Sequence, residues 1–173
     1  QVSLMANRIR QNPMDFGNST TFAVTCDIPQ IEEQSKKLLQ MVRYFGLGEV
    51  EWMYDPNTKE YKFLEINTRA WKWHTISNQL GFSFIGAMID YYNGLTIKQP
   101  TATQTVGWVE RLTDWTVSAK EIFRGRMKIS TIKDSYKMKY LVTWHQANDP
   151  AVWAGGCRYY IDRLEVYTDY KHF

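Results

Sequence analysis

Three polar side chains at alternate positions are the most informative feature of the sequence. Glu65, Asn67 and Arg69 stand at every second place in residues 63–69 (FLEINTR). In an extended strand, residues i and i+2 point the same way, so Glu65 and Asn67 project from one face. Arg69 lies just past the expected end of that strand. The side-chain oxygens of Glu65 and Asn67 and the guanidinium of Arg69 are therefore expected to lie close together at the end of the strand.

A second run with alternating carboxylates precedes this one. Residues 49–54 carry Glu49 and Glu51 between apolar neighbours, and a cluster of turn-forming residues separates them from the run at 61–67. This pattern predicts an antiparallel hairpin with a longer loop. The hairpin places at least one of the two carboxylates across from Glu65. Facing carboxylates repel each other unless a positive group lies between them.

A small group of carboxylate and amide oxygens is typical of a Mg²⁺ site, where water and substrate phosphate complete the coordination. The chemistry expected of these residues is therefore the binding of a magnesium nucleotide. Arg69 would hold an acyl phosphate or the carboxylate that attacks the γ-phosphoryl group. On spacing alone one alternative stays open, in which Glu51, Glu65 and Asn67 only edge a solvated sheet face.

The sequence patterns around these residues predict an α+β fold with an antiparallel sheet and flanking helices. Runs of β-branched and aromatic residues between turn formers indicate strands, and apolar residues at helical spacing that end at glycine indicate helices. Besides the hairpin, strands are expected at 20–26, 105–112 and 139–144, and helices at 30–45, 71–80, 83–93, 117–124 and 130–137. The stretch after residue 149 receives no assignment.

Length and composition limit the classes of function. The 173 residues are about the size of one domain, and no apolar run approaches the roughly 20 residues that span a bilayer. A net charge of +3 is too small to predict nucleic-acid binding.

Cys26 and Cys157 lie far apart, which favours neither a disulfide framework nor a zinc site. A reducing, cytoplasmic location is expected, as is a chain that begins mid-protein, because residues 1–10 lack an initiator Met and a signal pattern.

The motifs together resemble the C-terminal half of an ATP-grasp ligase. The resemblance runs from about Arg8 to Gly94 and depends on residues 46–52 (GLGEVEW), on residues 63–69, and on the helices that follow. Its signature is a Glu on one strand and Glu-x-Asn-x-Arg on the next. The most similar branch is that of the carboxylate-amine ligases, which includes D-aspartate ligase and the carbamoyl-phosphate synthase large chain.

The resemblance implies roles for four residues. Glu51 and Glu65 would bind the Mg²⁺ or Mn²⁺ ions that bridge the ATP phosphates, and Asn67 would complete that site. Arg69 would contact the substrate or the acyl phosphate. The implied reaction phosphorylates a small carboxylate with ATP, after which an amine attacks the acyl phosphate and forms an amide-type bond.

The resemblance also implies a nucleotide pocket and a division of the chain. Met53 and Leu64 would flank the base and ribose of the nucleotide. In the family, the phosphate-binding lysines and the Gly-rich lid precede this segment, so the N-terminal domains and the ATP lid are expected to be missing. Residues 1–98 would be the C-terminal part of the ATP-grasp core and residues 99–173 a small α+β subdomain. A homodimer stays open.

Two arginines near the N-terminus and an excess of aromatic residues also bear on function. Arg8 and Arg10 share one face of any extended segment, and ordinary surface charge is the favoured interpretation of both.

Aromatic residues make up 15% of the chain. This excess supports an alternative function, a non-catalytic module that binds a nucleotide or stacks a ligand on exposed tryptophans. The tryptophans considered for stacking are Trp71, Trp73, Trp108 and Trp115.

Overall fold

The computed structural model describes residues 2–17, 19–97 and 104–142. The strands in chain order are β1 (Met5–Asn12), β2 (Ser19–Cys26), β3 (Glu49–Asp55), β4 (Glu60–Asn67), β5 (Gly107–Val109) and β6 (Tyr140–Val142). The helices are α1 (Pro29–Met41), the 3₁₀ helix η1 (His74–Leu80), α2 (Phe84–Tyr92), α3 (Arg111–Phe123) and α4 (Ile129–Ser135). The predicted α+β class is confirmed.

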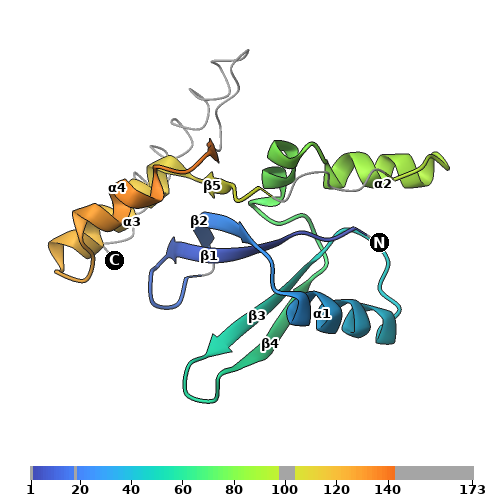
Figure 1. Ribbon diagram of the computed structural model, residues 1–173, viewed down its shortest axis with the longest axis horizontal. Coiled ribbons are helices and arrows are strands. Elements are labelled where there is room, and N and C mark those ends of the chain that lie inside the picture. The colour runs from blue at the N-terminus through green and yellow to red at the C-terminus, as the bar shows by residue number, and fades with distance from the viewer. Residues whose placement is uncertain (1, 18, 98–103, 143–173) are drawn as a thin grey trace, which may run out of the picture.

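Two separate sheets organise the chain. One has the order β1-β2-β5-β6, and the other is the β3-β4 hairpin. All pairs are antiparallel except β5 with β6, which run parallel. In Figure 1, α3 and α4 lie at one end of the molecule and α2 at the other, with β1 and β2 between them. The division at residue 98 and the missing ATP lid stay predictions.

The strand at 20–26, the hairpin and the helix at 83–93 are confirmed, but α1 is shorter than expected. It ends at Met41 instead of Phe45 because Arg43 adopts a left-handed conformation with φ 51°. The amides of Arg43 and Tyr44 then bond back to the carbonyls of Gln40 and Leu39, at 3.0 and 2.8 Å. This is the Schellman arrangement, in which a left-handed residue closes a helix, usually a glycine.

Other boundaries differ for reasons that hydrophobic spacing does not reveal. Strand β1 was not predicted. The helix expected at 71–80 is a 3₁₀ helix from His74, and the strand expected at 105–112 stops at Val109, where α3 begins at Arg111. The buried face of α3 is mostly polar, so its helical period did not show as apolar spacing. That face consists of Thr113, Asp114, Val117, Ser118 and Glu121.

The hydrophobic core contains most of the tryptophans considered for ligand stacking. Trp71, Trp73 and Trp108 are buried, and they pack with Ile76, Val106 and several phenylalanines. Only Trp115 of the four is exposed, at 56%. The stacking version of the alternative function therefore loses three of its four surfaces. No helix in the described part of the chain is long and apolar enough to cross a membrane.

A buried ion pair joins α3 to β1. Arg10 is 2% exposed, and its Nε and Nη2 donate to the two oxygens of Asp114, both at 2.8 Å. The prediction that Arg10 is surface charge is therefore wrong. The reason is an irregularity in β1, where the register shifts between Arg8 and Arg10. The shift lets Arg8 reach the hairpin while Arg10 reaches α3, so the two arginines do not share partners.

Candidate functional site

The hairpin brings the predicted carboxylates together. In the register of β3 and β4, Glu51 lies opposite Glu65 and Glu49 lies opposite Asn67. A bulge follows Glu51, between Glu51 and Trp52. The expectation that a carboxylate would face Glu65 is confirmed. Three carboxylates and one amide therefore converge at the end of the hairpin that is distant from its turn.

The side chain of Asn67 lies among the three carboxylates. Its Nδ2 donates to Glu51 Oε1 at 2.8 Å and to Glu65 Oε1 at 3.1 Å, and Glu49 Oε2 is 3.5 Å away. A carboxamide offers donors on one side and an oxygen on the other. Rotating this amide by half a turn would present its oxygen to a cation held between Glu51 and Glu65. Asn67 can therefore donate to the carboxylates, as it does here, or accept with its oxygen toward a bound cation.

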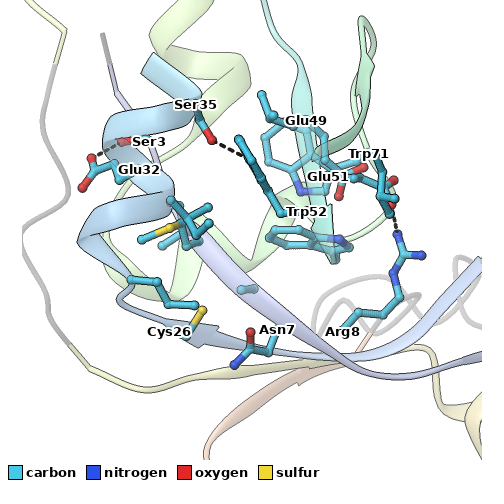
Figure 2. Close-up of a pocket in the computed structure, with 18 of the residues that line it drawn as sticks. Ser3, Asn7, Arg8, Cys26, Glu32, Ser35, Glu49, Glu51, Trp52 and Trp71 are labelled. Atoms are coloured by element: carbon cyan, nitrogen blue, oxygen red, sulfur yellow. Dashed lines mark hydrogen bonds and ion pairs between the residues drawn. The ribbon is translucent and has the colours of Figure 1, made fainter. Parts of the chain in front are cut away.

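Arg8 supplies the positive group that facing carboxylates require. From β1 its Nη2 pairs with Glu51 Oε2 at 2.9 Å, as Figure 2 shows. The Arg8 side chain is 29% exposed and the Glu51 side chain 18%, so the pair stays partly accessible to solvent. The interpretation of Arg8 as ordinary surface charge missed this contact. Its only sequence signal is its place in an extended segment, because the partner lies 43 positions away.

The surroundings of Glu49 raise the pKa of its carboxyl group. Burial, followed by the charge of Glu51, raises the pKa of Glu49 to about 7. Arg8, Arg69 and the Asn67 amide act in the opposite direction, and they do not cancel the rise. In the absence of a further cation, Glu49 therefore keeps its proton to a higher pH than an ordinary carboxyl group does.

This shift predicts how stability depends on pH. The folded protein holds the Glu49 proton more tightly than the ordinary carboxyl does, so ionisation of Glu49 opposes folding as pH rises from about 4.5 through about 7. Glu49→Gln removes that ionisation. We expect the melting temperature of this variant, relative to the unchanged protein, to be higher at pH 8 than at pH 4, measured by thermal denaturation without divalent cations.

Glu60→Gln is the matched control on the same hairpin. Glu60 is exposed, and its pKa is lowered by Lys62, with which it pairs. Its replacement should therefore give no gain at pH 8. An equal effect of pH on both variants would contradict the origin assigned to the Glu49 shift.

The remaining predicted residues lie around this cluster. Arg69 is exposed just beyond β4, where its Nη1 donates to the carbonyl of Ala70 at 3.3 Å. Met53 and Leu64 are about half exposed, at 55% and 49%, and both line a cavity that also reaches Glu51. The structure thus brings Glu51, Glu65 and Asn67 into direct contact. Arg69, Met53 and Leu64 lie outside this group of contacting side chains.

The donor set fits a hard cation that takes few protein ligands. Within the described residues, no group of three His, Cys, Asp or Glu side chains is arranged as a metal site. Mg²⁺ in nucleotide sites commonly takes one or two carboxylates and obtains its other ligands from water and phosphate. Glu51, Glu65 and the oxygen of Asn67 match that chemistry.

Comparison with known proteins relates this geometry to a family. Residues 16–99 match the family model described as the carbamoyl-phosphate synthase L chain, ATP binding domain. The predicted resemblance to the ATP-grasp ligases is confirmed. The matched segment contains the whole β3-β4 hairpin and Arg69, whereas Arg8 precedes it.

The chain is also similar to a curated protein over part of its length. The chain is 30% identical over 69 residues to a protein named acetyl-CoA carboxylase 1 from Oryza sativa subsp. japonica. These residues make up 40% of this chain and 3% of that protein, so the chain spans a small fraction of its relative. No solved structure matches the chain significantly.

Beside the carboxylate cluster, the matched segment and β1 enclose a cavity of about 520 Å³. Its lining comes from β1, α1 and the hairpin, together with Trp71, Trp73 and Phe84. Figure 2 shows two hydrogen bonds on its wall, from Ser3 to Glu32 and from the Trp52 indole to Ser35. The sequence alone gave no sign of this cavity, because its walls come from segments that are distant in the chain.

Proposed function

We propose that this chain is the metal- and nucleotide-binding part of an ATP-dependent ligase that joins a carboxylate to an amine. The observation that carries the proposal is the contact of Asn67 with both Glu51 and Glu65 on facing strands, at 2.8 and 3.1 Å. The match of residues 16–99 to an ATP-binding domain supports it independently.

In this proposal the hairpin holds Mg·ATP. Glu51, Glu65 and the Asn67 oxygen would hold the metal, and Met53 and Leu64 would lie against the base and ribose. A metal held there would offset the negative charge that develops on the transferred phosphoryl group. The half-exposed apolar surfaces of Met53 and Leu64 suit a ring that must enter and leave.

The chemistry proceeds through an acyl phosphate. A carboxylate oxygen of the substrate attacks the γ-phosphorus of ATP, and ADP leaves. Arg69, exposed beyond β4, holds the acyl phosphate through paired hydrogen bonds. The amine then attacks the acyl carbon, phosphate leaves with the bonding electrons, and the amine releases a proton to solvent. The product is an amide-type bond.

The test of this proposal is the affinity of the chain for Mg·ATP, measured by isothermal titration calorimetry. Glu65→Gln keeps the size of the side chain but removes the charge that binds the metal. We expect the Kd to rise at least about tenfold, the lower end of the loss seen when support for a metal site is removed. Binding of ATP without a divalent cation should change little.

Glu60→Gln, on the same strand but next to the hairpin turn, is the control and should keep the original Kd. Equal Kd values for the unchanged protein and both variants would contradict the proposed site.

A further inference from the structure

The cavity beside the carboxylate cluster has apolar walls. Leu4, just before β1, and Ala6 of β1 form one wall, helix α1 contributes Ile31 and Leu39, and strand β3 contributes Val50. The cavity volume of about 520 Å³ lies within the range of about 300–1,000 Å³ that is usual for small-molecule sites. Cys26, whose thiol pKa is raised chiefly by burial, also lines the cavity.

Polar donors lie in the same lining. Arg8 uses one edge of its guanidinium for Glu51 at 2.9 Å, and a guanidinium has five N–H donors. Its further contacts, to Gln11 and to the carbonyl of Gly17, are long at 3.4 Å. Arg8 therefore keeps donor capacity for an additional carboxylate.

Trp71 gives an independent sign of a ligand. This residue lines the cavity and is 5% exposed, and its indole Nε1 is buried without a hydrogen-bond partner among the described residues. Buried polar atoms in native proteins are nearly always paired, and an unpaired one requires an explanation. An acceptor oxygen brought by a bound molecule would satisfy this donor.

We propose that the cavity binds a carboxylic acid with an apolar chain, whose tail lies among Leu4, Ala6 and Val50 and whose carboxylate meets Arg8. The assignment of this acid as the substrate that is phosphorylated rests on the proposed ligase function. Its binding to the cavity does not. Placed at Arg8, the carboxylate would lie next to Glu51 and hence next to the metal and the γ-phosphate.

The first test uses simple acids and the full chain without ATP, with tryptophan fluorescence and calorimetry as readouts. Burial of methylene groups should make octanoate bind more tightly than butanoate, by roughly tenfold for each added pair. Octanoate should also exceed octanamide by about tenfold or more, because only the acid forms a charge-assisted contact with Arg8. Equal binding of octanoate, butanoate and octanamide would overturn the proposal.

Paired variants locate the binding. Ala6→Phe fills the cavity and should weaken octanoate binding at least tenfold, whereas Ala119→Phe on the exposed side of α3 should not. Arg8→Gln should weaken octanoate but leave octanamide unchanged, and Arg124→Gln should affect neither. Thermal denaturation of Ala6→Phe checks that it folds, and the Arg8 pair decides the question if it does not.

Competition with ATP separates this proposal from the ligase function. Octanoate and Mg·ATP should bind together, because the acid would lie among Leu4, Ala6 and Val50 and the nucleotide at Met53 and Leu64, which are different parts of the lining of one cavity. Mutual exclusion would assign the cavity to the nucleotide and overturn the acid site. Loss of ATP binding in Glu65→Gln with intact octanoate binding would support both proposals. Octanoate binding by a chain that does not bind Mg·ATP would support the acid site and contradict the proposed function.

Discussion

Replacing Asp114 by alanine is expected to lower the free energy of unfolding by about 3–5 kcal/mol, which is the usual cost of removing one partner from a buried ion pair. Asp114 is fully buried and accepts two hydrogen bonds from Arg10. It also accepts from the hydroxyls of Thr21 and Tyr136, each at 2.9 Å. The variant leaves the Arg10 charge buried without a counter-ion and two hydroxyls without an acceptor.

The loss should appear in urea denaturation followed by fluorescence and circular dichroism. Asp134→Ala is the matched control, because Asp134 pairs with Lys137 on the surface, where both side chains are more than half exposed. Exposed pairs of this kind contribute about 0–1 kcal/mol. A cost for Asp114→Ala as small as that of the control would contradict the burial of this network.

Replacing Arg69 by lysine is expected to lower turnover by about 10²–10³-fold, the usual effect of losing one donor to the transition state. Lysine keeps the charge but cannot form the paired planar contact that arginine makes with a phosphate. Arg69 has no hydrogen bond to the three carboxylates of the hairpin in the structure, so the affinity for Mg·ATP should change little. The measurement is kcat together with the KM for ATP in the proposed ligase reaction.

Arg124→Lys provides the control, because Arg124 lies at the exposed end of α3 and pairs with Glu121. Unchanged turnover in Arg69→Lys would remove Arg69 from the mechanism. A large rise in the KM for ATP with unchanged kcat would instead make Arg69 a nucleotide-binding residue.

Local spacing in the sequence determined the hairpin and its main chemistry. The alternation of Glu65 and Asn67 places both on one strand face, and antiparallel pairing places Glu51 across from Glu65. The helix α2 was similarly readable, since Ser83 caps its start through the amide of Gly86 at 3.1 Å and Gly94 follows its end. Such features depend on neighbours within a few residues, so periodicity and turn chemistry are enough to predict them.

Tertiary packing alone decided which distant groups meet. Arg10 and Asp114 are 104 positions apart, and nothing in either segment shows that a shifted register in β1 turns Arg10 toward α3. The same shift leaves Arg8 to pair with Glu51. The raised pKa of Glu49 likewise depends on burial between elements and on the charge beside it. Contacts and solvation of this kind are properties of the assembled layers, because Coulomb and desolvation energies depend on distance in space and not on spacing along the chain.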